Sequence, residues 1–243
     1  MRTFLSYLGL FFTIILFIQG CKEKQPDAMP ERKRAYLHFI NLNPDYSGID
    51  CKVQSFETDN FLFNNLGYIQ TWPVGGYASL LSLQSQDSAG KAWITFEIQN
   101  HQTGDTIIPE QTLTLFEEKA TTMILLKDAA GSPLLIKTLD NFASDDDTTT
   151  FVRFMNFDES ITSARLISQD SSVLIDNLGY LNYTGFRAFK KGIYNISIID
   201  KGTGNIIDVK NNVNLRLRRN YSFFIIKNVN TGASEVVMEE MNK

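Results

Sequence analysis

The chain has 243 residues, of which 43% are hydrophobic and 12% aromatic, and this composition is typical of a globular protein with one large or two small domains. The formal net charge of −4 argues against a nucleic-acid partner, because nucleic-acid-binding proteins carry a basic surface. Residues 31–149 carry eight Lys+Arg and sixteen Asp+Glu, a net charge of −8, whereas residues 150–243 carry twelve and nine, a net charge of +3. If the two halves are duplicated copies, this difference indicates sequence drift between them. The alternatives are attraction between two domains and a charged partner that only one of them faces.

The N-terminus has the pattern of a secretion signal. Arg2 gives a positive charge, residues 4–18 are almost wholly apolar, and Gly20-Cys21 follows directly. The apolar run of residues 4–18 is shorter than the about 20 residues needed to span a bilayer, so residues 1–20 are interpreted as a signal peptide. The segment Ile18-Gln19-Gly20-Cys21 resembles the lipobox of bacterial lipoproteins, which implies cleavage before Cys21 and lipidation of Cys21. An ordinary secretory signal with an accidental cysteine is the alternative.

Residues 21–33 are polar and charged, contain Pro26 and Pro30, and are expected to form a flexible tether. The Lys/Glu cluster after Cys21 resembles the surface-export signal of Bacteroidetes lipoproteins. These resemblances imply an outer-membrane protein held by its lipid anchor and exposed at the cell surface. Cys51 is then the one thiol of the mature body, so stability is expected from packed cores.

The remaining chain repeats one β-rich pattern, and a repeat decides the fold assignment. The phrase Asn-Leu-Gly-Tyr occurs at residues 65–68 and 177–180, and residues 36–41 match residues 151–156 position for position. Short apolar segments separated by turn residues favour β-sandwiches. We therefore predict an all-β protein with two tandem immunoglobulin-like β-sandwich domains, residues 34–142 and 151–243, joined by an acidic linker at residues 143–150. The strands predicted for domain 1 are residues 34–41, 49–53, 61–63, 78–83, 92–98, 111–116, 121–127 and 134–139, and domain 2 repeats this course.

Several of these motifs resemble the bacterial envelope family called domain of unknown function 4397: the opening Arg34-x-x-x-His38-Phe-Ile-Asn-x-Asn-Pro-Asp45, the Ile49-Asp-x-x-Val53 strand, the Gly-Tyr phrase and the final hairpin. The resemblance covers residues 34–240 and implies small sandwiches in tandem on a lipoprotein. The second copy departs from it, with Phe157-Asp158-Glu159-Ser160 at the Asn-Pro-Asp turn. The family has no established activity, so the resemblance implies a fold and an envelope setting.

No catalytic motif is present in the sequence. His38 and His101 are the only histidines; His38 matches Arg153 in the second copy, as expected of an outward-facing strand position. We predict a protein that is not an enzyme, without a cofactor and without a metal site. Asp145–Asp147 could supply oxygen ligands to Ca²⁺, although a solvated acidic linker is the commoner use of such a run.

Aromatic residues follow the repeated phrase in both copies. Exposed together, they would stack on sugars or form a protein-binding patch; the alternative is sandwich core, with Gly67 and Gly179 allowing a turn with positive φ. The candidate binding residues are Tyr68, Trp72, Tyr180 and Tyr183. Ser88, Thr106 and Thr148 each follow an Asp and resemble acceptors of Bacteroidetes O-glycosylation.

These patterns predict a non-catalytic, lipid-anchored cell-envelope protein that presents two β-sandwich domains for protein or glycan binding. A structural spacer or assembly subunit of an outer-membrane complex is the alternative. An enzyme whose site no motif reveals is the third.

Overall fold

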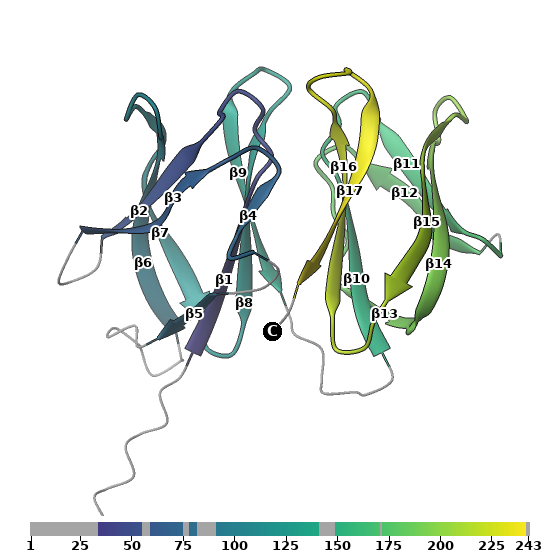
Figure 1. Cartoon of the computed structure of the whole chain (residues 1–243), viewed down its shortest axis with the longest axis horizontal. Helices are drawn as coiled ribbons and strands as arrows, with labels where there is room; N and C mark the ends of the chain where they lie inside the picture. The colour runs from purple at the N-terminus through teal and green to yellow at the C-terminus, as the bar shows by residue number, and fades with distance from the viewer. Residues whose placement is uncertain are drawn as a thin grey trace, which may run out of the picture. The chain divides into compact units, whose positions relative to one another are not determined.

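The computed structural model describes residues 34–54, 59–74, 78–81, 91–140, 149–170 and 172–241. Residues 34–243 belong to one compact unit. Within the described ranges every regular element is a β-strand (Figure 1), and the predicted all-β fold is confirmed. The predicted signal peptide and tether, and residues 143–148 of the predicted linker, lie outside the described residues.

Repeat one, residues 34–140, contains two sheets. Its inner sheet has the order β4-β1-β8-β9, with β5 also paired to β1, and its outer sheet has the order β3-β2-β6-β7. Strands β1 and β8 are parallel, and the other pairs are antiparallel. The strands are β1 (Arg34–Asn41), β2 (Ile49–Gln54), β3 (Asp59–Leu66), β4 (Gln70–Trp72), β5 (Ala78–Leu81), β6 (Lys91–Asn100), β7 (Thr106–Phe116), β8 (Ala120–Lys127) and β9 (Pro133–Asp140).

Repeat two, residues 149–241, follows the same course. Its inner sheet has the order β13-β10-β16-β17 and its outer sheet the order β12-β11-β14-β15, with β10 and β16 parallel. The strands are β10 (Thr149–Asn156), β11 (Ser163–Ser168), β12 (Val173–Gly179), β13 (Arg187–Lys190), β14 (Gly192–Asp200), β15 (Ile206–Leu215), β16 (Asn220–Lys227) and β17 (Ser234–Met241).

Side chains that alternate along the strands form one core inside each sandwich. In repeat one, Leu37 and Phe39 of β1 pack with Phe96 and Ile98 of β6. In repeat two, Phe154 stacks on Phe223, with ring centroids 5.2 Å apart, inside the corresponding core. Both cores lie between an inner and an outer sheet.

A third apolar cluster lies between the two inner sheets. The faces of β1, β8, β10 and β16 that point away from their own sandwich therefore pack against the other repeat. Burying a side chain of this size contributes on the order of 1.5–3 kcal/mol, so the contact stabilises both repeats. The fully or nearly fully buried members are Ile40, Leu42, Ile124, Leu126, Met155, Phe157, Phe224 and Ile226.

A polar group of side chains lies beside this apolar cluster. The Arg153 guanidinium forms a buried ion pair with Asp140 of repeat one, with 2.5 Å between Nη1 and Oδ1, and donates to the Thr122 and Thr138 hydroxyls. His38 Nε2 lies 3.1 Å from Glu239 Oε2 of repeat two. His38 is 0% exposed and Arg153 is 2% exposed, so the prediction that both face outward is wrong. They do point away from their own sandwich, but the other inner sheet covers them.

The boundaries of two predicted elements also need correction. Thr149 and Thr150 belong to β10 and not to the linker, because Thr150 Oγ1 and the Phe151 N–H both bond to the Arg219 carbonyl, at 2.8 and 3.1 Å. Strand β7 begins at Thr106, five residues before the predicted start, and includes Pro109. Proline is tolerated there because β7 is the edge strand of its sheet.

Candidate functional site

The β8–β9 turn and the β16–β17 turn lie side by side (Figure 1). Residues of both turns line a pocket of about 620 Å³ between the repeats. Corresponding residues of the two repeats line it, and its apolar floor consists of Leu42, Leu126, Phe157 and Ile226, which belong to the cluster between the inner sheets. The pocket therefore exists only because the two repeats pack against each other.

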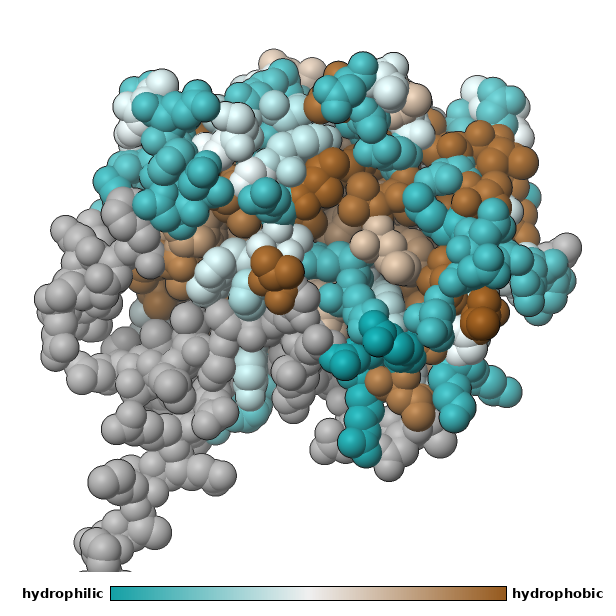
Figure 2. Space-filling view, viewed as in Figure 1, coloured by the Kyte–Doolittle hydropathy of each residue, from teal (hydrophilic) through white to brown (hydrophobic). Residues whose placement is uncertain are grey.

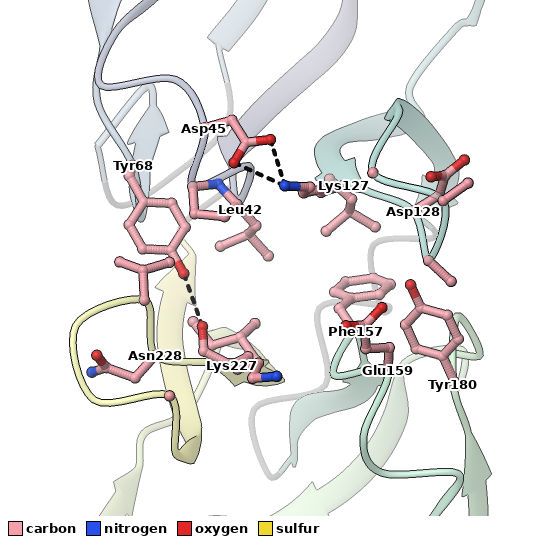
Figure 3. Close-up of a pocket in the computed structure, with 18 residues that line it drawn as sticks. Leu42, Asp45, Tyr68, Lys127, Asp128, Phe157, Glu159, Tyr180, Lys227 and Asn228 are labelled. Carbon is pink, nitrogen blue, oxygen red and sulfur yellow. Dashed lines mark hydrogen bonds and ion pairs between the residues drawn. The ribbon is translucent and has the colours of Figure 1, made fainter.

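Tyr68 and Tyr180, the last residues of the repeated phrase, line this pocket from opposite sides (Figure 3). The same turn holds each tyrosine: the following residue, Ile69 or Leu181, has a φ of 58° or 57° and donates its N–H to the carbonyl of Asn41 or Asn156, at 2.7 and 2.8 Å. The repeated phrase thus directs one tyrosine from each repeat into one pocket.

The glycines of the phrase have a different use from the predicted one. Gly67 and Gly179 are not among the residues with positive φ. A Cβ on Gly67 would lie 3.0 Å from the Gln70 side chain, and a Cβ on Gly179 would lie 2.8 Å from Asn182. A side chain at either position would therefore displace the end of the neighbouring amide side chain.

The two tyrosine hydroxyls differ in their partners. Tyr68 donates to the Lys227 carbonyl of the other repeat, at 3.3 Å, whereas the Tyr180 hydroxyl makes no hydrogen bond with the described residues. Burial raises the pKa of both phenols; Glu235 adds to this for Tyr68, and the charges of Glu159, Asp128 and Asp158 add to it for Tyr180.

The charged groups at the pocket rim also differ between the two repeats. Lys127 Nζ pairs with Asp45 Oδ2 at 2.7 Å, and the hydrogen bond to Asp45 raises the pKa of Lys127. The matching positions in repeat two are Lys227 and Ser160, and Lys227 has no ion-pair partner among the described residues. Glu159 stands where repeat one has a proline. The rim thus offers both hydrogen-bond donors and acceptors.

The other two predicted binding aromatics lie outside this pocket. Trp72 is partly buried at the end of β4 and packs on the core of repeat one, with its ring centroid 5.8 Å from that of Phe63. Tyr183 is 45% exposed and forms an isolated bridge with Met155. Of the four predicted aromatics, the structure brings together Tyr68 and Tyr180.

The other predicted sites are only partly described. Cys21, Ser88 and Thr148 lie outside the described residues, as does the acidic run Asp145–Asp147. Thr106 is exposed at the start of β7, where its hydroxyl bonds to Glu97 and lowers the pKa of that carboxyl. Over the described ranges, no three His, Cys, Asp or Glu side chains come together in a way that could hold a metal ion. No helix in those ranges is long and apolar enough to cross a membrane.

The sequence interpretation missed the pocket rim. The sequence pattern indicates turn or strand-end positions for Asp45, Lys127 and Glu159, and nothing in a single repeat indicates that they meet residues of the other copy. The Lys127 and Lys227 match, at an offset of 100, was the available signal. Figure 2 shows hydrophilic and hydrophobic side chains mixed along the upper edge, with more continuous hydrophobic surface below it and on the side of repeat two.

No protein-family model matches the chain. No curated protein matches it either. Among solved structures, the chain is similar to the Bacillus anthracis TIE protein, with a TM-score of 0.27 and 6% identity over 86% of this chain and 34% of that one, so the chain spans about a third of that protein.

Two further structures are similar over most of both chains. One is a family-26 carbohydrate-binding module of Eubacterium rectale Amy13K in complex with maltoheptaose, with a TM-score of 0.25 and 11% identity over 84% of this chain and 95% of that one. The other is the fimbrial anchor protein Mfa2 from Porphyromonas gingivalis, with a TM-score of 0.24 and 11% identity over 85% of this chain and 97% of that one. Likeness at these TM-scores carries no argument about function.

Proposed function

We propose that this protein is a non-catalytic, lipid-anchored protein of the outer membrane that binds a protein or glycan ligand in the pocket between its repeats. The observation that carries the binding function is the convergence of Tyr68 and Tyr180, from equivalent positions of two repeats, on one pocket with an apolar floor and a polar rim. Ligand sites combine these features: a concave apolar surface with a few polar groups that orient the ligand.

The anchoring part of the proposal is supported by the sequence of residues 1–33. The lipobox-like segment ending at Cys21 and the charged tether after it are the features of a surface lipoprotein. Several acyl chains on one cysteine would hold the protein stably, where a single chain binds only marginally. Membership of the envelope family named above is proposed on the motif residues of both copies.

A spacer function is the second candidate, and the packing of the inner sheets favours it. The contacts of Arg153, His38 and the apolar cluster stabilise the packing of one repeat against the other. The described residues therefore form a unit suited to holding a partner at a set distance. A spacer does not need an occupied pocket, and this difference separates the two candidates.

The test is photo-crosslinking in cells. A photoreactive phenylalanine analogue replaces Tyr68 or Tyr180 in the full-length protein, and Tyr183 in a matched control outside the pocket. A binding protein gives a crosslinked adduct at positions 68 and 180 and none at 183. Adducts at all three positions, or at none, would contradict ligand binding in the pocket and leave the spacer function.

Location is tested separately by protease treatment of intact cells. Loss of the protein before the outer membrane is broken supports surface exposure. Protection of the protein until the membrane is broken contradicts surface exposure and directs the search for the ligand to the periplasm.

A further inference from the structure

We infer that the ligand of this pocket is a neutral oligosaccharide whose sugar rings lie against Tyr68 and Tyr180. The inference rests on the proposed binding function and specifies its ligand. The pocket volume of about 620 Å³ lies within the range of about 300–1,000 Å³ found for small-ligand sites, so the pocket is large enough for a short stretch of glycan.

The first argument is the placement of the two aromatic rings. Tyr68 and Tyr180 are partly buried and line opposite sides of the pocket, with Leu42 and Phe157 between them in the floor (Figure 3). One face of a pyranose ring presents C–H groups, which pack on the electron-rich face of an aromatic ring. Two tyrosines at two walls therefore suit a ligand with repeated flat apolar faces.

The second argument is the mixture of polar groups at the rim. Lys227 offers an ammonium group without an ion-pair partner in the described chain, and Glu159 offers a carboxylate that makes no hydrogen bond there. Lys127 and Asp45 neutralise each other. Sugar hydroxyls both donate and accept, so they satisfy groups of either kind. An apolar peptide would instead cover the Glu159 carboxylate and the Lys227 ammonium group without supplying hydrogen bonds to them, at a substantial cost.

The third argument is the difference between the two hydroxyls. The Tyr68 hydroxyl already donates a hydrogen bond to the Lys227 carbonyl, so Tyr68 contacts the sugar through its ring alone. The Tyr180 hydroxyl has no partner in the described chain and lines the same pocket, where it is available to a sugar hydroxyl. The two tyrosines should therefore respond differently to loss of the hydroxyl and similarly to loss of the ring.

The experiment is calorimetric titration of the full-length protein in a detergent without a sugar headgroup. The probes are unbranched neutral hexasaccharides of glucose, mannose and N-acetylglucosamine, with a heparin hexasaccharide and a hexalysine peptide as charged competitors. At least one neutral hexasaccharide should bind, and no charged probe should bind more tightly.

The variants then assign binding to the pocket. Tyr68→Ala and Tyr180→Ala should each weaken binding by about tenfold, because each removes a stacking surface. Tyr180→Phe should weaken it by about fivefold through loss of one hydrogen bond, while Tyr68→Phe and the control Tyr183→Ala should change it by less than about twofold. Circular dichroism checks that each variant is folded.

Each remaining outcome either overturns the inference or supports it. Tighter binding of heparin or hexalysine, sensitive to Tyr68 and Tyr180, would show another ligand class while the binding function stands. Sugar binding indifferent to both alanine variants would place the glycan elsewhere. If no hexasaccharide binds, sugar analysis of the adducts from the cellular crosslinking decides between the remaining cases. A protein adduct contradicts a glycan ligand, and a glycan adduct supports one. The absence of any adduct contradicts the binding function itself.

Discussion

Asn43 and Asp158 occupy equivalent positions in the two repeats, and one side-chain atom distinguishes them. In both, Oδ1 accepts a hydrogen bond from the backbone N–H of the residue two positions later. The N–Oδ1 distance is 3.0 Å from Asp45 to Asn43 and 2.9 Å from Ser160 to Asp158. Asn43 Nδ2 also donates to the Leu126 carbonyl, at 2.9 Å. Asp158 places a carboxylate oxygen where Asn43 has this amide nitrogen, and that buried oxygen has no hydrogen-bond partner in the described protein.

We therefore expect Asp158→Asn to stabilise the protein, because the new amide can donate to the Ile226 carbonyl, which corresponds to Leu126. A buried polar atom without a partner costs about 1–3 kcal/mol, so the free energy of unfolding should rise by about 1 kcal/mol. Urea unfolding measures the change. The matched variant Asn43→Asp should lower the free energy of unfolding; a loss of stability in Asp158→Asn would contradict the argument.

Asp170, in the turn between β11 and β12, carries a second residue-scale prediction. The Ser168 hydroxyl, followed by the Ser172 hydroxyl and N–H, lowers the pKa of Asp170 from 3.8 to about 2. Because the pKa is lowered on folding, these bonds contribute stability above about pH 4, and that contribution disappears as the pH falls toward 2. Nuclear magnetic resonance titration of the carboxyl carbon should show this pKa, and Ser172→Ala should raise it. An ordinary pKa in the unmodified protein would refute the turn geometry.

At the scale of elements, the buried pair between Arg153 of β10 and Asp140 of β9 joins the repeats. Removing one partner of a buried ion pair leaves a charge without compensation, so Arg153→Met should lower the free energy of unfolding by about 3–5 kcal/mol. The double variant Arg153→Met/Asp140→Leu should recover much of this loss. Chemical denaturation measures both.

The control for this pair is Arg165→Met. Arg165 pairs with Asp176 at 2.7 Å, but both side chains are largely in solvent, at 39% and 58% exposed. Exposed pairs are worth about 0–1 kcal/mol, so this variant should change stability little. Equal effects of the two arginine substitutions would contradict a buried, stabilising contact between the repeats.

The same elements show what the sequence could predict. Alternation along β1 places Leu37 and Phe39 on one face of the strand and His38 and Ile40 on the other, and the structure agrees. Alternation does not say whether water or another sheet covers the second face. A stronger signal was present in β8 and β16, where residues 123–126 and 223–226 are apolar at every position. Such continuous runs are typical of strands buried on both faces.

The pocket was only partly predictable for a related reason. The repeated phrase identified Tyr68 and Tyr180, because the phrase marks the same turn in each copy. Their meeting depends on how the copies pack, which is a property of neither copy alone. The same holds for the charge difference between the copies: attraction between domains was one interpretation, and the Arg153–Asp140 pair is a contact of that kind.

At the scale of the whole molecule, we expect both repeats to unfold in one transition, because the third cluster shares its apolar surface between them. The two tryptophans, Trp72 and Trp93, both lie in repeat one, so their fluorescence reports that repeat while circular dichroism reports the strands of both. The two signals should change at the same urea concentration. A lower midpoint for either signal would show that the repeats unfold independently.

Equivalent residues of the two repeats meet in the cluster between the inner sheets and in the pocket, an arrangement that resembles a symmetric dimer within a single chain. In a dimer of identical subunits, a two-fold axis forces both walls of a central pocket to carry the same residues. Here covalent linkage has freed the two repeats to diverge, so that Asp45 of the first corresponds to Ser160 of the second and Asp128 corresponds to Asn228. A ligand bound there as we propose would meet different groups on the two walls, so its two ends would not be interchangeable.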